Sequence, residues 1–389
     1  MKSFIALLSL TIIYFNGFAQ SFTFTQGGTT DKHYYNETPY ETLSRKIFLY
    51  VEIAGKRRKF LFDTGAPTAI NKELAAELKF NVLHKVLVSD ALGIQDSVSI
   101  VSVKRIKIGN VTFNDIPAVT IIPDFLKCWN IEGVVGSNIL RNSIVRIVPD
   151  KHLIIITDNE DTLSLKNKIN IPLTENNYSQ NFPTIKILLK DKVNVEFGFD
   201  TGDPGFLSLS EDYMRQLNQF NVYQVLSKGY GSHKLGGFGL QKNDSTYRLK
   251  IDFLKIGDSK FDNVITETDK NGVSRIGSKL LDYGAVTLDF INRKFYFEAT
   301  NAKNDLNEKQ WPLRPVINDH KLLVGTVWAK LVDQIKPGQQ ITAINDIAYD
   351  KIDLCDWIHN KSVFDNKEKI ILKIKDERGK IKIVQVMKE

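Results

Sequence analysis

Apolar and polar residues alternate along most of the chain between Leu43 and Phe297. A period of two over several residues is typical of β-strands with one buried face. The pattern is longest in four stretches: Val98 to Ile108, Val111 to Ile122, Ile144 to Ile156 and Ala285 to Phe297. Few helix signals exceed two turns, whereas a doubly wound sheet needs helices of roughly 10 to 15 residues between its strands. The pattern therefore predicts a mainly β fold.

One segment of this pattern occurs twice. Residues 60–67 read FLFDTGAP and residues 197–204 read FGFDTGDP, and a further apolar strand and a short turn precede each copy. In both copies an apolar strand ends in an acid, a Thr and a Gly, which is how a buried strand delivers a carboxylate onto a tight turn. Short amphipathic helix signals follow at Asn71 to Leu78 and at Ser210 to Leu217. We expect the two acids to meet.

Two further landmarks recur in the same order. An Ile-Gly turn follows a strand at Ile108 and at Ile256, and an apolar residue precedes Gly-Ser at Val135 and at Ile276. The acid, the Ile-Gly turn and the Gly-Ser segment of one copy lie 137, 148 and 141 residues from those of the other. Copies of this length can each bury a core, so the repetition predicts two homologous lobes rather than a solenoid.

The first 42 residues divide into two segments. A Met-Lys start, an apolar run over residues 4–15 and a Gly-Phe-Ala ending predict a signal peptide at residues 1–19, with cleavage after Ala19. The run is short for a membrane span, and a retained anchor helix is the alternative. Residues 20–42 are polar with scattered Phe and Tyr. They are a predicted N-terminal arm, either a strand that crosses to the other lobe or a loose segment.

The pattern changes after Phe297. Residues 301–315 are polar and close on Trp-Pro-Leu-Arg-Pro, which predicts a linker. Residues 316–389 then give an apolar strand, a Pro-Gly turn and a second apolar strand that leads into Ile-Asn-Asp. Two last strands are expected at Lys369 to Lys375 and at Lys380 to Met387.

The order of these C-terminal signals is similar to the central segment of a PDZ domain. The resemblance implies a small PDZ-like α+β domain at residues 316–389, a module that captures extended peptides at a sheet edge. A Gly-rich carboxylate-binding loop is expected before the first strand, but Asp319-His320-Lys321 stands there. Docking of a peptide or protein partner and a purely structural role therefore both stay open.

Charge and composition narrow the choice of partners. The chain carries 52 Lys and Arg against 45 Asp and Glu, a net charge of +7, and the basic residues are scattered. Their only compact run, Lys56 to Lys59, stands at a predicted hairpin tip, so we expect no nucleic-acid partner. The hydrophobic share of 42% argues against disorder across the bulk of the chain. After signal removal no stretch is long enough to span a membrane.

Cysteine and histidine usage argues against a disulfide framework and against a metal site. Cys128 and Cys355 are the only cysteines, and they fall in different predicted domains beside apolar residues. The expectation is two buried thiols and no disulfide framework. The six His are widely spaced singles without metal-ligand spacing, so no metal and no cofactor is expected.

The paired Asp-Thr-Gly motifs inside a matched repeat resemble the pepsin and retropepsin class of aspartic proteases. The resemblance covers roughly residues 40 to 300 and is to a two-lobed form on one chain. It implies two acid-protease-type β-barrel lobes, at residues 43–165 and 166–300. Residue by residue it implies a catalytic dyad and supporting residues: Asp63 and Asp200 as the dyad, Thr64 and Thr201 as the cross-bracing threonines, and Gly65 and Gly202 where the backbones approach closely.

The resemblance also implies an activity. It points to a secreted or periplasmic aspartic endopeptidase that hydrolyses a polypeptide through a water activated between two carboxylates. Candidate flaps over the substrate are Lys85 to Val101, with its tip at residues 91–94, and the Gly-rich region from Gly229 to Gly239, which is expected to be mobile. The alternative is a catalytically inactive peptide-binding protein that keeps the two-lobed cleft and the PDZ-like module.

Two residues of the second copy depart from the family pattern. Asp203 follows the second Asp-Thr-Gly, where a small residue is usual, and Arg275 precedes Ile-Gly, where an apolar residue is expected. A third acid that points inward would raise the proton affinity of the dyad. We hypothesise that Arg275 pairs with Asp203, which would make the two departures one compensated change.

Overall fold

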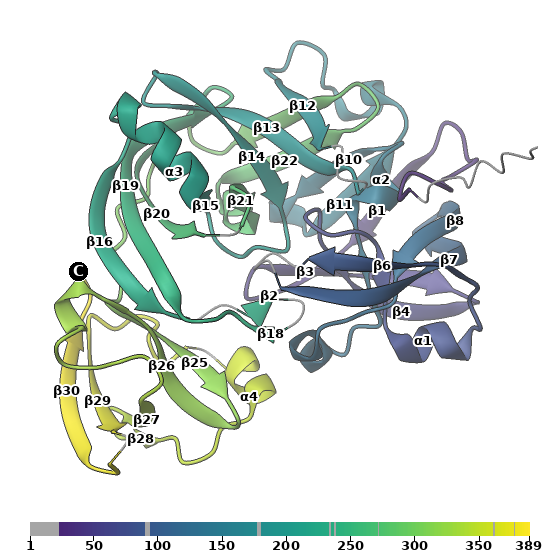
Figure 1. Cartoon of the computed structure of the whole chain (residues 1–389). Coiled ribbons are helices and arrows are strands. Elements are labelled where there is room, and N and C mark those ends of the chain that lie inside the picture. Colours follow the sequence, from purple (N-terminus) through teal and green to yellow (C-terminus); the bar gives the residue numbers. More distant parts are fainter. Residues whose placement is uncertain are drawn as a thin grey trace, which may run out of the picture.

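The structure is a computed structural model that describes residues 23–89, 94–176, 180–232, 235–236, 239–270, 272–360, 362–376 and 378–389. Strands dominate it and the helices are short, as the alternating pattern predicts (Figure 1). No helix of this described part is long and apolar enough to cross a membrane. The predicted signal peptide and its cleavage point lie outside the described residues.

The first repeat spans residues 46–157. Its hairpin of β3 and β4 leads to the first Asp-Thr-Gly. Its elements are β3 (Lys46–Ile53), β4 (Lys56–Phe62), β5 (Ala69–Ile70), α1 (Lys72–Glu77), β6 (Val82–Ser89), β7 (Gln95–Ile108), β8 (Val111–Val119), the 3₁₀ helix η1 (Asp124–Trp129), β9 (Gly133–Val135), α2 (Ser137–Leu140), β10 (Ile144–Val148), η2 (Pro149–Lys151) and β11 (Leu153–Thr157).

The second repeat spans residues 182–299 and keeps the same order. Its elements are β13 (Phe182–Leu189), β14 (Val193–Asp200), β15 (Leu207–Ser210), α3 (Glu211–Leu217), η4 (Asn218–Phe220), β16 (Gln224–Gly231), β17 (Leu235–Gly236), β18 (Gly239–Leu240), β19 (Asp244–Ile256), β20 (Ser259–Asp269), β21 (Arg275–Gly277), η5 (Ser278–Tyr283), β22 (Gly284–Asp289) and β23 (Lys294–Ala299).

Strand pairing confirms that the sequence repeat is a structural repeat. The strand before each acid runs parallel to a later strand, β4 to β9 and β14 to β21. The parallel pairs β5 with β8 and β15 with β20 also correspond, as do the antiparallel hairpins β7 with β8 and β19 with β20. Both predicted helices form behind side-chain N-caps, because Asn71 accepts from the N–H of Leu74 and Ser210 from that of Tyr213.

A six-stranded arrangement joins the two repeats. Its order is β1 (Tyr35–Pro39), β11, β10, β22, β23 and β12 (Ile171–Asn176), and β10 and β22 meet at its centre with Val145 opposite Leu288. The predicted N-terminal arm thus contains a strand, but β1 stays beside β11 of the first repeat and does not cross to the second. One hydrophobic core runs through both repeats, so they pack as a unit.

The C-terminal unit, residues 313–389, has a hydrophobic core of its own. It contains β25 (Leu313–Asn318), β26 (Lys321–Trp328), η6 (Ala329–Leu331), β27 (Gln340–Ile344), β28 (Ile347–Ala348), α4 (Leu354–His359), β29 (Lys369–Lys375) and β30 (Ile381–Met387), with the last two close to their predicted bounds. Besides β1 and β12, three short elements lie outside the units: β2 (Glu41–Leu43), η3 (Glu160–Leu163) and β24 (Lys303–Asp305). Within the predicted linker, β24 pairs with β20.

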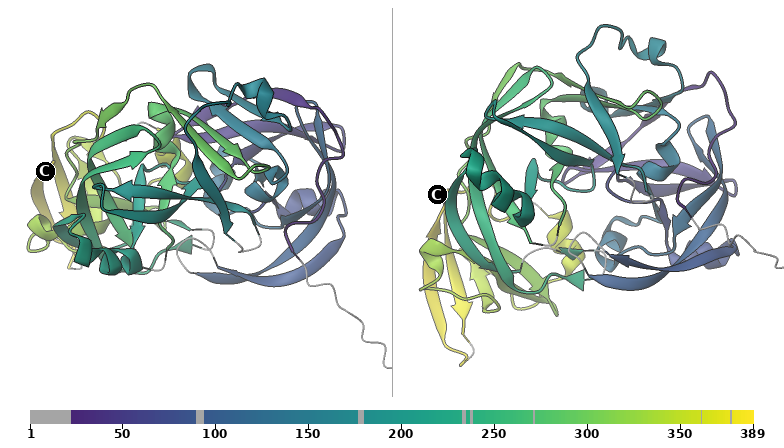
Figure 2. Two further views of the ribbon diagram at one scale, coloured as in Figure 1. Left: turned by 90° about the horizontal axis from the view of Figure 1, so that it is seen from above. Right: turned by 45° about the horizontal axis from the view of Figure 1, so that its top comes forward.

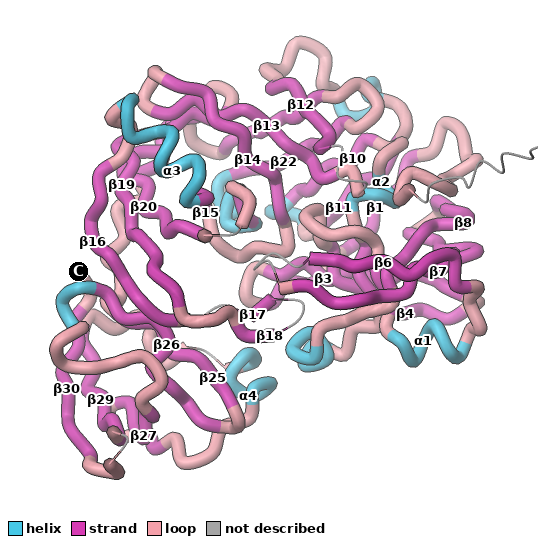
Figure 3. Tube along the Cα trace, viewed as in Figure 1, coloured by secondary structure: helices cyan, strands magenta, loops and turns pink. Residues whose placement is uncertain are grey.

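The C-terminal unit contacts both repeats. Strand β26 pairs antiparallel with β16, with Tyr230 opposite Val327, and so extends the sheet of the second repeat. The unit lies beside β16 in all three ribbon views (Figures 1 and 2), and its helix α4 turns toward the first repeat (Figure 3). Ile358 of α4 packs against an apolar cluster of that repeat.

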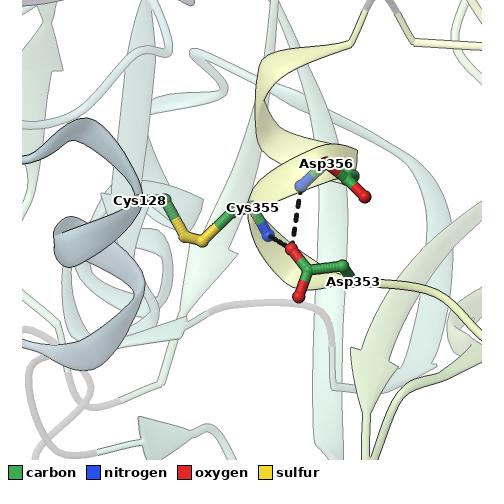
Figure 4. The surroundings of a disulfide bond; sticks show 4 residues. All are labelled: Cys128, Asp353, Cys355 and Asp356. Atoms are coloured by element: carbon green, nitrogen blue, oxygen red, sulfur yellow. Dashed lines mark hydrogen bonds between the residues drawn. A yellow bond between two sulfur atoms is a disulfide. The ribbon is translucent and has the colours of Figure 1, made fainter.

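The expectation of two free thiols was wrong. Cys128 of η1 and Cys355 of α4 form a disulfide with a Cα–Cα distance of 4.9 Å, across 227 residues of sequence (Figure 4). Asp353 caps α4 by accepting hydrogen bonds from the N–H groups of Cys355 and Asp356, at 2.7 and 3.1 Å. Membership in different domains did not keep the cysteines apart, because docking of α4 on η1 brings them together.

Candidate active site

Each Asp-Thr-Gly turn is held by a strand threaded beside it. In the first repeat the N–H of Asp63 donates to the carbonyl of Val135 at 3.0 Å, which continues the parallel pairing of β4 with β9. In the second repeat Asp200 is in parallel register with Gly277 of β21. The same local pairing thus presents a carboxylate at the end of each strand.

The two turns are cross-braced by their threonines. The Thr64 hydroxyl donates to the carbonyl of Phe199 at 2.6 Å, and the Thr201 hydroxyl donates to that of Phe62 at 2.9 Å. Each hydroxyl also accepts the backbone N–H of the opposite threonine, at 3.0 Å in both directions. Both side chains are fully buried. These four reciprocal bonds fix the position of one turn against the other.

The carboxyl groups pack against the opposite turn. A Cβ atom added to Gly65 would overlap the carboxyl of Asp200, and one added to Gly202 would overlap that of Asp63. Each carboxylate accepts the N–H of its own glycine, Asp63 Oδ1 at 2.9 Å and Asp200 Oδ1 at 2.8 Å. The structure thus brings together all six residues that the sequence indicates at this site, and glycine is needed where each acid crosses the other turn.

Crowding changes the titration of Asp200. Burial, followed by the charge of Asp63, raises the pKa of the Asp200 carboxyl to about 7 from an ordinary value of 3.8. Arg275 and Lys46 act in the opposite direction, and Asp203 adds to the rise. Two carboxyls that crowd each other favour a shared proton, because both cannot readily ionise together.

Arg275 and Asp203 do not pair with each other, so that hypothesis was wrong. The carboxylate of Asp203 accepts the N–H of Gly205, two residues further along the chain, at 2.7 Å. Arg275 instead directs its Nε atom toward Oδ2 of Asp200, at 3.8 Å. The arginine lies near Asp200 because β21 runs parallel to β14, with Arg275 opposite Gly198, two residues before Asp200.

Two further residues reach the site from outside the repeated motif. Lys46, at the start of β3, donates through Nζ to the carbonyl of Gly202 in the other repeat. Gln180, between the repeats, donates through Nε2 to the carbonyl of Gly65 at 3.0 Å. Neither stands in a local pattern that indicates a site, so only the assembled fold reveals them.

The predicted flap segments have different environments. Strands β6 and β7 form a hairpin at the first segment, but residues 91–93 of its predicted tip, 91–94, lie outside the described residues. Gly229, Tyr230 and Gly231 do not form a mobile loop, because they lie within β16 and pair with both β19 and β26. A side chain at Gly231 would overlap the carbonyl of Gly325, so glycine here permits close approach of β26.

One family model matches part of the chain. Residues 49–139, from β3 to α2, match a family model described as Aspartyl protease. A similar solved structure is a retropepsin-like aspartic protease from Rickettsia conorii, at 20% identity, with 32% of this chain and 90% of that chain covered and a TM-score of 0.24. A search of curated proteins gives no match.

The matched segment includes Asp63, Thr64 and Gly65. The family match, which covers the first repeat only, supports an aspartic protease activity and hence a polypeptide substrate. Across the residues that the structure describes, no three His, Cys, Asp or Glu side chains gather as a metal site.

Proposed function

We propose that the chain is a two-lobed aspartic endopeptidase in which Asp63 and Asp200 form the catalytic dyad. The observation that carries the proposal is the reciprocal bonding of Thr64 and Thr201. These bonds hold two buried turns so close that only glycine fits beside each carboxyl. A peptide-binding protein without turnover would not need two acids so close that the charge of one raises the pKa of the other, because desolvating acids together is unfavourable.

The chemistry follows from one proton shared by two carboxyls. The ionised member takes a proton from a water molecule, whose oxygen attacks the carbonyl carbon of the peptide bond. The protonated member donates to the carbonyl oxygen, on which negative charge develops in the tetrahedral intermediate. Collapse of the intermediate breaks the C–N bond, the carboxyl that took the proton of the water passes it to the leaving amine, and the dyad again holds one proton. No covalent bond to the enzyme forms.

We further propose a PDZ-like fold for the C-terminal unit, with a structural docking role. Strand β26 uses one edge on β16, and α4 packs through Ile358 against the first repeat. Because α4 already packs against the first repeat, it is less free to bind a separate peptide. This favours contact within the chain over capture of a peptide partner.

Export to the periplasm or the cell exterior is also a proposal. It rests on the N-terminal signal pattern and on the Cys128–Cys355 disulfide, because disulfides persist mainly in oxidising compartments.

The test is cleavage of a denatured protein by the chain from Gln20, scanned from about pH 3 to 9, beside Asp63→Asn and the matched surface control Asp333→Asn. Because the Asp200 pKa is about 7, the dyad keeps its shared proton almost to neutrality and activity is lost as pH rises through about 7. Asp63→Asn should lower kcat by about 10²–10⁴-fold, the range for a lost acid or base. Asp333→Asn should cleave normally.

Peptide binding distinguishes the alternative function. If the wild type binds an extended peptide but does not cleave at any pH, the proposal fails and the inactive peptide-binding protein takes its place. If Asp63→Asn cleaves as fast as the wild type, cleavage comes from another site or a contaminant, and the dyad assignment fails.

A further inference from the structure

A buried cation stands where the first repeat has only apolar side chains. Leu61 and Val134 are opposite each other on β4 and β9 and belong to an apolar cluster. The corresponding pair on β14 and β21 is Gly198 and Arg275. The Phe182 ring fills the space beside Gly198, because a Cβ atom added to Gly198 would overlap that ring. The second repeat has therefore replaced an apolar pair with an arginine next to its catalytic acid.

The guanidinium is desolvated and aimed at the dyad. Arg275 is only 8% exposed, and its Nε atom makes no hydrogen bond in the structure. The nearest anionic atom is Oδ2 of Asp200 at 3.8 Å, while Oδ1 of the same carboxyl is held by the N–H of Gly202. A buried arginine with an unused donor is costly unless it has a charge partner. That partner is the carboxyl oxygen that the backbone leaves uncommitted.

We propose that Arg275 is a positioning residue for the dyad, which orients the Oδ2 atom of Asp200 and, with Lys46, balances the negative charge of the site. This inference rests on the proposed function, in which Asp200 is one of the reacting acids. Arg275 approaches from β21 and Lys46 from β3, whereas Asp63 and Asp203 are the acids that face Asp200. With one proton on the dyad, the remaining ionised dyad carboxyl and Asp203 match the two cations in charge.

The charges around Asp200 shift its pKa in directions that can be measured. A nearby cation favours the ionised form of a carboxyl and so lowers its pKa. Removal of Arg275 should let burial and Asp63 raise the Asp200 pKa further, and the alkaline limb of activity should move to higher pH. Removal of Asp203 should have the opposite effect, because this acid adds to the rise. A role in packing alone would change stability or kcat without moving the limb.

The experiment measures kcat/KM against pH for Arg275→Gln, Arg275→Lys, Lys46→Gln and Asp203→Asn in the full chain. Arg275→Gln should move the alkaline limb upward by about 1 pH unit, Lys46→Gln upward by less, and Asp203→Asn downward, by the usual effect of one neighbouring charge. Arg275→Lys keeps the charge and should stay near the wild-type limb. The control Lys104→Gln removes an exposed cation that pairs with Asp115 on the surface, and should not move the limb.

The outcomes separate the two proposals. No cleavage by the wild type at any pH overturns the proposed function itself. A wild type that cleaves, with Arg275→Gln folded and its limb unmoved, overturns only the role of Arg275. If Arg275→Gln does not fold, Lys46→Gln and Asp203→Asn decide, and limbs that fail to move in opposite directions refute the charge balance.

Discussion

At the scale of single residues, the site depends on atoms that have no alternative partner. Thr64 and Thr201 are fully buried, and each hydroxyl is both a donor to a carbonyl and an acceptor for an N–H across the repeat boundary. Water cannot reach these groups to replace a lost bond. The threonine of each Asp-Thr-Gly motif therefore holds the two turns together, whatever the adjacent aspartate does.

Thr64→Val should reveal this role in stability. The substitution keeps the shape but leaves the carbonyl of Phe199 and the N–H of Thr201 without their partner, at about 1–3 kcal/mol for each buried group. We expect the free energy of unfolding, measured by urea titration, to fall by about 2 kcal/mol or more. The double variant Thr64→Val with Thr201→Val should lose less than the sum of the single losses, because the two hydroxyls share one network.

Thr162→Val is the matched control. Its hydroxyl also donates to a carbonyl, that of Asn159 at 2.7 Å, but the pair is exposed and water can replace the bond. Equal stability losses for Thr64→Val and Thr162→Val would contradict the importance of the cross-brace.

The local chemistry of the site could be predicted from sequence, but its environment could not. Asp63 and Asp200 could be found because an acid, a Thr and a Gly after an apolar strand form a contiguous signal, and the signal is repeated. Lys46 lies 156 residues from Gly202, and no local pattern links them. The partner of Arg275 was mistaken for Asp203 because the sequence does not tell which way a turn residue points.

At the scale of elements, β16 is the strand with which the C-terminal unit pairs. Its glycines let β26 approach closely, and the side chain of Arg248 on β19 completes the contact. Arg248 is 2% exposed, binds Glu267 at 3.0 Å and the carbonyl of Trp311 at 3.1 Å, and lies over the Trp328 ring. Burial, as the largest effect, lowers the pKa of this guanidinium, and the negative charge of Glu267 acts in the opposite direction. The buried charge therefore depends on its contacts.

Arg248→Met should weaken this docking. Removal of one member of a buried ion pair costs about 3–5 kcal/mol, because the other charge stays buried. Here Arg314 also pairs with Glu267 at 3.0 Å, so we expect the lower end of that range. Hydrogen exchange should become faster in β16 and β26 first. Arg215→Met, which removes an exposed arginine paired with Asp212, should change neither stability nor exchange there by a comparable amount. Unchanged exchange in β26 would show that Arg248 does not hold the unit.

At the scale of the whole molecule, the C-terminal unit links the two repeats. It joins the second repeat through β16 and Arg248, and the first repeat through Cys128–Cys355 and Ile358. The periodic strands of each repeat could be predicted because they depend on local alternation. The linkage could not, because it depends on how finished units dock, and cysteines 227 residues apart carry no mark of their pairing.

The double variant Cys128→Ser with Cys355→Ser should therefore destabilise the molecule. A disulfide that closes a long loop restricts the unfolded chain, and its loss typically costs about 2–4 kcal/mol in the free energy of unfolding. We expect this loss by urea titration, together with faster hydrogen exchange in η1 and α4, where the two cysteines lie. Reduction of the wild type should reproduce both effects.

Reducing agent supplies the internal control, because the double variant has no cysteine left to reduce. If reductant lowers the stability of the wild type and leaves that of the double variant unchanged, the effect belongs to the disulfide rather than to the serine substitutions. If reduced and oxidised wild type unfold at the same urea concentration, packing of α4 on η1 alone holds the C-terminal unit to the first repeat. The bond would then be a consequence of docking, with no measurable share in its stability.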